Sequence, residues 1–81
     1  MKENELYLIL FETPSGWDNL ATVYRSLSGS TQGVSKVWRN FNTATCCRVV
    51  HIWVNPETGK TDSVLERETY RPQIILPHSR G

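Results

Sequence analysis

Residues 46–70 decide the fold, and they read CCRVVHIWV (46–54), NPETGK (55–60) and TDSVLERETY (61–70). The first run is β-branched or aromatic on both of its faces, which is typical of a central β-strand. The middle run holds Pro56, which presets the first angle of a turn, and Gly59, which accepts a positive φ. The last run is more polar, as expected of a strand with one face in water. The sequence therefore predicts a β-hairpin.

Charge indicates the register of this hairpin. The favoured register pairs Val54 with Lys60. It places Arg48 opposite Glu66, whereas a slip by one residue would place it opposite Arg67. Like charges directly opposite one another destabilise a sheet, and a slip by one also moves every side chain to the other face. We expect the first register.

On the N-terminal side, residues 5–12 (ELYLILFE) form an apolar run bracketed by charge, which predicts a strand buried on both faces. Pro14 and Gly16 then interrupt it. Ser15 and Asp18 have the spacing of a helix capping box. The residues that follow them keep helical spacing up to a C-cap position at Gly29, namely Leu20, Val23, Tyr24 and Leu27. We therefore expect a first helix here.

The same spacing recurs in Val34, Val37, Trp38 and Phe41. It predicts a second, shorter helix from about Gln32 to Asn42. A strand over residues 34–42 stays open as an alternative, because several of these residues are β-branched. Near the C-terminus, residues 73–76 lie between two prolines and suit an edge strand, and residues 78–81 suit a frayed tail.

The expected fold class is α+β, with a small antiparallel sheet in the chain order β-α-α-β-β-β and two helices packed on one face. At 81 residues the chain has room for one domain, over residues 1–77, followed by a tail at 78–81. Its core should lie between the sheet and both helices. The expected core residues are Leu8, Leu10, Leu20, Val23, Leu27, Val37, Val50, Ile52 and Trp53.

The composition is that of an ordinary globular protein, with 38% hydrophobic and 21% charged residues. The longest apolar run, residues 6–11, is too short for a signal-peptide core or a membrane span. The two cysteines are adjacent, which does not suit a disulfide framework. We therefore expect a cytoplasmic protein of undetermined oligomeric state that does not bind a membrane.

Cys46, Cys47 and His51 are the residues that could suggest catalysis or metal binding. On a strand, the two cysteines point to opposite faces, and Cys47 lies roughly 13 Å from His51 at about 3.3 Å per residue. A nucleophile and its base must approach to about 3 Å, and a zinc site needs more ligands. We expect buried, unreactive thiols, a cross-strand hydrogen bond from His51 to Ser63, no metal, no cofactor and no enzymatic activity.

Charge is unevenly distributed along the chain. Residues 1–18 have a net charge of −3, residues 19–60 of +4 and residues 61–81 of zero. Such asymmetry can mark an acidic partner or nucleic acid. If the apolar side of the helix at 32–42 faces inward, its outer side carries Gln32, Ser35, Lys36 and Arg39. With the hairpin 46–70 as a wing, this arrangement would suit nucleic-acid binding, which is the first alternative function.

The second alternative is a toxin that cleaves RNA. The expected order β-α-α-β-β-β resembles that of bacterial RelE-type ribonucleases. The resemblance is one of topology alone, and no motif is shared. It implies catalysis by clustered basic and aromatic side chains on the hairpin, for which the candidates are Arg48, Lys60, Arg67, Tyr70 and Arg71.

The function we expect is that of a small inhibitor or adaptor that binds another protein, one with an acidic surface being the natural complement of the basic middle segment. The chain holds three Trp and three Tyr, more aromatic area than a core of this size hides easily. Exposed Trp, Tyr and Arg dominate the energetics of interfaces. The predicted binding residues are Trp17, Gln32, Ser35, Lys36, Trp38, Arg39 and Arg48.

Overall fold

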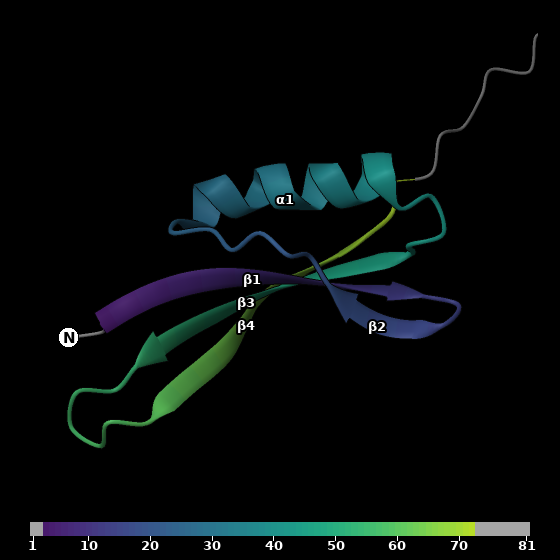
Figure 1. Cartoon of the computed structure of the whole chain (residues 1–81). Coiled ribbons are helices and arrows are strands. Elements are labelled where there is room, and N and C mark those ends of the chain that lie inside the picture. The colour runs from purple at the N-terminus through teal and green to yellow at the C-terminus, as the bar shows by residue number, and fades with distance from the viewer. Residues whose placement is uncertain (1–2, 73–81) are drawn as a thin grey trace, which may run out of the picture.

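The computed structural model describes residues 3–72, which form one antiparallel sheet and one helix (Figure 1). The edge strand expected at 73–76 and the tail expected at 78–81 lie outside the described residues. The elements are β1 (Glu3–Thr13), β2 (Gly16–Asn19), α1 (Leu27–Asn40), β3 (Cys46–Val54) and β4 (Thr61–Tyr70). Within residues 3–72 no helix is long and apolar enough to cross a membrane.

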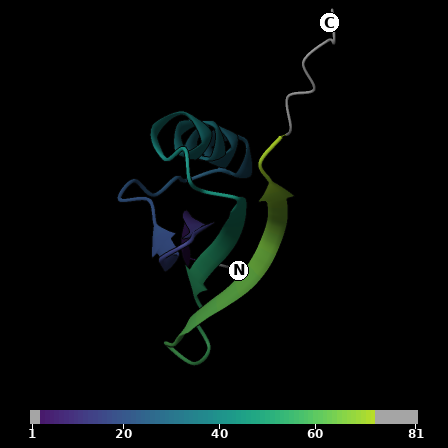
Figure 2. The ribbon, with the colours of Figure 1, turned by 90° about the vertical axis from the view of Figure 1, so that its right-hand side faces the viewer.

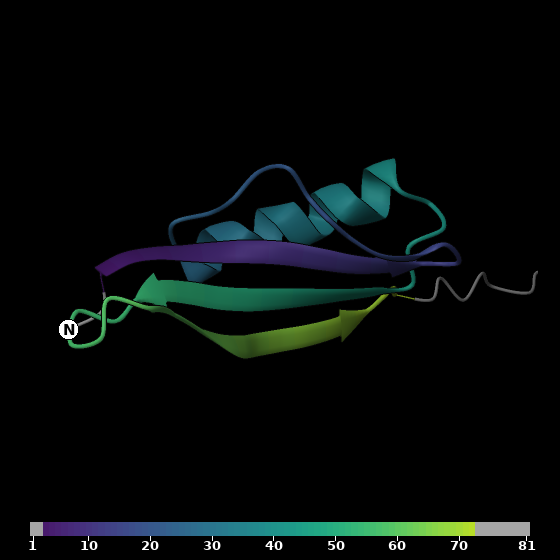
Figure 3. The same cartoon turned by 60° about the horizontal axis from the view of Figure 1, so that its bottom comes forward.

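The four strands lie in the order β2-β1-β3-β4, and every neighbouring pair is antiparallel. The helix α1 lies across one face of the sheet (Figures 1 and 2). Seen from the side opposite the helix, β1, β3 and β4 run side by side with the helix behind them (Figure 3). The fold of residues 3–72 is thus α+β with an antiparallel sheet, as predicted, but it has one helix instead of two.

The first predicted helix is wrong, because Ser15 and Asp18 belong to a hairpin. Pro14 and Ser15 form its turn, and Gly16 has a φ of +117°, a conformation that side chains rarely adopt. After the turn, β2 pairs back onto β1, with Trp17 opposite Glu12. The Ser15 amide, which a capping box would have served, donates instead to the Thr13 hydroxyl at 3.1 Å.

Of the residues with helical spacing beyond β2, Leu20, Val23 and Tyr24 lie in a segment along the outer edge of β1, whereas Leu27 begins α1. The amide of Leu20 donates to the Ile9 carbonyl at 2.9 Å. Tyr24 and Tyr7 exchange two backbone hydrogen bonds, at 2.6 and 2.9 Å. This segment therefore binds the backbone amides and carbonyls at the edge of β1 beyond the end of β2. The amides of Leu20 and Tyr24 bond to β1 and not to carbonyls of a helix.

The second predicted helix is present, but it begins earlier than expected. Ser26 is its N-cap, and the Ser26 hydroxyl accepts a hydrogen bond from the Gly29 amide at 3.0 Å. Gly29, expected to end a helix, therefore lies in the first turn of this one. Val34 and Val37 are buried, as the spacing predicted, and the helix ends at Asn40. The strand alternative for residues 34–42 is excluded over the helical residues.

The core lies between α1 and one face of the sheet, and four of the five core residues predicted on the strands lie on the other face, Trp53 being the exception. Its members are Ile9, Phe11, Leu20, Val34, Val37, Ala44, Cys47 and Val49, with Tyr7, Tyr24, Leu27 and Trp38 packed against it. Of the predicted set, Leu20, Leu27 and Val37 are in place, whereas Val23 is exposed. Leu8, Leu10, Val50 and Ile52 alternate with the core residues and point to the opposite face.

The register of the β3–β4 hairpin differs from the predicted one and contains a bulge. Val54 pairs with Thr61 and Val50 with Leu65, which is the slipped register. Continued without change, it would bring Arg48 opposite Arg67. An extra residue in β4, at Glu66, shifts the pairing so that Arg48 lies opposite Glu68. Arg48 therefore does lie opposite a glutamate, as predicted, but a bulge brings this about instead of a uniform shift of register.

Arg71, just after β4, holds the C-terminal end of α1. Its guanidinium donates to the carbonyls of Ala44 at 2.6 Å, Phe41 at 2.6 Å and Trp38 at 3.2 Å. It also lies over the Trp38 ring, 4.9 Å from the centroid. The last carbonyls of a helix have no partner within the helix, and a cation is favoured at that end of the helix dipole. Arg71 thereby joins the sheet to the helix.

The contact between α1 and β1 leaves no room for a side chain at Gly33. A methyl group there would lie 2.6 Å from a ring carbon of Tyr24 and 2.9 Å from a side-chain carbon of Ile9. Alanine favours a helix over glycine by about 1 kcal/mol, but overpacking costs about 1–3 kcal/mol. We expect Gly33→Ala to lower the free energy of unfolding, measured by urea denaturation.

Ser35→Ala is the matched control, because Ser35 lies exposed on the same helix. It should change the free energy of unfolding by no more than about 0.5 kcal/mol. A Gly33→Ala variant as stable as the wild type would contradict the close approach of helix and strand.

Candidate functional site

The face of the sheet turned away from α1 carries a row of apolar side chains that nothing in the described structure covers. We call it the open face. Its apolar residues come from three strands, and Leu65 on β4 is the most exposed of them, at 51%. The apolar members are Leu6, Leu8, Leu10, Val50, Ile52, Val54 and Leu65. Large exposed apolar surfaces on a small protein indicate interaction sites.

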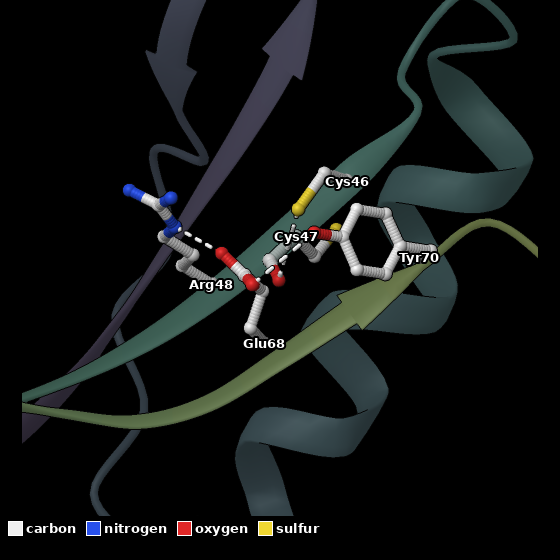
Figure 4. A network of polar contacts seen from close by, with 5 residues as sticks. All are labelled: Cys46, Cys47, Arg48, Glu68 and Tyr70. Carbon is white, nitrogen blue, oxygen red and sulfur yellow. Dashed lines mark hydrogen bonds and ion pairs between the residues drawn. The ribbon is translucent and has the colours of Figure 1, made fainter.

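One end of the open face is polar and aromatic (Figure 4). The Arg48 Nε donates to a Glu68 carboxylate oxygen at 2.6 Å, and the Tyr70 hydroxyl donates to the other oxygen at 3.3 Å. The Arg48 guanidinium lies over the ring of Trp17, 4.4 Å from its centroid. Trp17 is 43% exposed on β2. Four residues from three strands thus form one connected group.

The electrostatics of this group follow from the ion pair. The hydrogen bond from Arg48 lowers the pKa of the Glu68 carboxyl. The negative charge of Glu68 raises the pKa of the neighbouring Tyr70 hydroxyl. The group therefore keeps a paired guanidinium and carboxylate and a neutral phenol at physiological pH. Among residues 3–72, the terminal nitrogens of Arg48 donate no hydrogen bond, so they can bind a further carboxylate.

The structure divides the predicted binding residues between two sides of the molecule. Trp17 and Arg48 meet on the open face. Gln32, Ser35, Lys36 and Arg39 lie on the outer side of α1, beyond the core. Lys36 and Arg39 therefore do not share a surface with Arg48.

Trp38, the seventh predicted binding residue, packs against the core and lies beneath the Arg71 guanidinium. It supports the helix and offers little free surface.

His51 is buried among acidic and aromatic side chains that the sequence analysis did not connect with it. It pairs with Val64 instead of Ser63 and is 3% exposed. Its Nε2 lies 2.7 Å from Glu5 and its Nδ1 lies 3.0 Å from Glu66. The ring stacks on Tyr7, with centroids 4.5 Å apart. Both nitrogens are thus occupied, and the bulge that aligns Arg48 also brings Glu66 to His51.

The two cysteines are free and buried, as predicted. Burial raises the pKa of both thiols, that of Cys47 to about 11 from an ordinary value of 9.0. A protonated, buried thiol is a poor nucleophile. Over residues 3–72, no group of three or more His, Cys, Asp and Glu side chains could hold a metal ion.

Three of the five hairpin residues proposed for RNA cleavage are engaged in contacts within the fold. Arg71 binds three backbone carbonyls, and Arg48 and Tyr70 both bind Glu68. The order of elements on which the resemblance to RelE-type toxins rested is also not the one observed, since β2 stands where the first helix was expected.

The residues of the candidate site that the sequence analysis did not include are Glu68, Tyr70 and Leu65. The predicted register placed Glu66 opposite Arg48, whereas the bulge places Glu68 there. Tyr70 was named as a candidate for RNA cleavage and was not among the predicted binding residues. A cross-strand search for opposite charges that allowed one extra residue in β4 would have found the Arg48–Glu68 pair.

Comparisons with known proteins found no relative of this chain. The chain matches no protein-family model, no curated protein and no solved structure at a significant level.

The raised pKa of Cys47 predicts a loss of stability in alkali. In the folded state the thiol keeps its proton up to about pH 11, whereas the unfolded chain loses it near the ordinary value of 9.0. The unfolded state is therefore favoured as the pH rises from about 9 to about 11, by at most about 1.4 kcal/mol per pH unit. Urea denaturation at several pH values should show this fall, and Cys47→Ala should make it shallower. Equal slopes in both proteins would contradict the assignment.

Proposed function

We propose that this chain is a small, non-enzymatic protein-binding module whose binding surface is the open face. The observation that supports it is the one-sided coverage of the sheet. The helix α1 buries Ile9 and Val49, while their neighbours Leu8 and Val50 point to the uncovered side. Burying apolar area is favourable by about 25 cal/mol per Å², so a partner that covers this face gains free energy.

The residue types at the polar end of the open face favour protein recognition over binding of a polyanion. Trp17, Arg48 and Tyr70 are of the three types most enriched among energetic hot spots of protein interfaces. The strand residues whose side chains the structure describes carry three charges on this face, those of Glu12, Arg48 and Glu68. They sum to −1, which gives nucleic acid no attraction to this face.

The reactive side chains of the described structure have structural roles, which favours binding over catalysis. His51 has both ring nitrogens engaged by carboxylates and is almost wholly buried. Cys46 and Cys47 are buried thiols with raised pKa values. Two free thiols also suit the reducing cytoplasm, which we propose as the location.

Photo-crosslinking can test the open face with a matched pair of positions. Leu65 and Val64 are adjacent on β4 and similarly exposed, at 51% and 45%, but they point to opposite faces. With a photoreactive residue at either position, we expect several-fold more covalent protein adducts from position 65 in cells that make the protein. Equal yields from the two positions would contradict the proposed surface.

Nucleic-acid binding is a second candidate, and the outer side of α1 is the surface that favours it. Lys36 and Arg39 lie there beside Gln32 and Ser35, and the helix contains no acidic residue. The same side would suit the acidic protein partner expected from the sequence. With Arg48 on the opposite side of the molecule, two helix cations remain, and contacts with two phosphates give weak binding.

Salt dependence separates this candidate from protein binding. If α1 binds nucleic acid, the logarithm of affinity for a random duplex should fall linearly with the logarithm of salt between about 50 and 200 mM. The Lys36→Ala, Arg39→Ala double variant should flatten that slope by about two units, and Arg48→Ala should not change it. Fluorescence anisotropy measures both. No binding at the lowest salt would remove the candidate.

A further inference from the structure

The open face is large enough to form a specific interface with one partner. Strands of about ten residues, at about 3.3 Å per residue and about 4.8 Å apart, give β1, β3 and β4 a face of roughly 33 by 15 Å, or about 500 Å² in projection. Protruding side chains raise its accessible area above the projection. Two such faces together bury more than about 1,000 Å², the size at which specific interfaces begin.

The open face has one hydrogen-bond donor group and one acceptor group without a partner among residues 3–72. The terminal nitrogens of Arg48 make no hydrogen bond among residues 3–72, because Glu68 takes only Nε. The side-chain carboxylate of Glu12, on the same face, has no hydrogen bond or ion pair within that range either. The face therefore carries both halves of an ion pair that it does not form.

A surface with these properties is complementary to itself. Its apolar centre matches any apolar surface, but its unmet guanidinium needs a carboxylate and its unmet carboxylate needs a cation. In a two-fold pair each contact occurs twice, so one copy supplies both missing groups to the other. Two-fold dimers are also the commonest assemblies of soluble proteins.

We propose that the open face is the interface of a symmetric dimer, in which the sheets of two copies pack face to face with α1 on the outside of each. This inference rests on the proposed function, since it names the partner of the same surface. The two sheets would form the inner layers of a sandwich, about 10 Å apart, with Leu8, Val50 and Leu65 in its centre. Arg48 of each copy would bind Glu12 of the other.

The test is the mass of the protein in solution, measured by sedimentation equilibrium from about 1 to 100 µM. We expect the wild type to have twice the 9.3 kDa of one chain. Leu65→Glu should weaken the dimer at least tenfold, because it places a charge in the apolar centre. Val64→Glu, the same change one residue earlier and on the other face, should leave it a dimer. Circular dichroism checks that both variants are folded.

A second pair of variants covers the case in which Leu65→Glu does not fold. Glu12→Lys should weaken the dimer several-fold, because the lysine of one copy would lie against Arg48 of the other and repel it. Glu57→Lys, in the exposed β3–β4 turn, makes the same change of charge away from the face and should not. A dimer that neither Leu65→Glu nor Glu12→Lys weakens would overturn the inference, because it would use another surface.

The failures of the two proposals are distinguishable. A monomeric wild type that crosslinks from position 65 to a different protein would overturn the dimer and support the binding module. Crosslinks from position 65 to residues 73–81 of the same chain would make that segment the occupant of the face and overturn both. A monomer with no preference for position 65 would also overturn both proposals.

Discussion

One helix of fourteen residues can bury only one face of a four-stranded sheet, and the structure depends on how closely that helix approaches β1. Gly33 permits the approach by leaving space for Tyr24 and Ile9. The packing that follows assigns every second residue of β1 and β3 to the core. It leaves the residues between them on the open face. The stability of the fold and the candidate binding surface are thus two results of a single contact.

The sequence was sufficient for the fold class, for β1, for the β3–β4 hairpin and for most of the helix. It was not sufficient to assign the faces, because β1 and β3 are apolar on both. Leu8 and Ile9 are equally hydrophobic, and only the position of α1 makes Ile9 fully buried and Leu8 partly so. The false first helix has a related cause. Leu20 and Tyr24 have helical spacing, but their amides bond to β1, a contact that a local pattern does not contain.

The candidate site was predictable in part for similar reasons. Trp17 and Arg48 were chosen for their residue types, and the fold brings them together across three strands. Glu68 joins them through the bulge at Glu66, which is a property of two strands and not of either alone. Trp38 had the right residue type for a binding surface, but Arg71 covers it. Residue type identified candidates, and the pairing of strands decided which of them meet.

The Arg71 contact also couples two parts of the molecule that are distant in the chain. Its guanidinium reaches carbonyls 27, 30 and 33 residues earlier, at the end of α1 and in the loop that leads to β3. Opening the end of β4 therefore removes the partners of the last helical carbonyls at the same time. These two ends should open as one cooperative unit in local unfolding, with similar rates of amide hydrogen exchange. The end of the helix is thus stabilised by Arg71, a residue that follows every strand of the described sheet in the sequence.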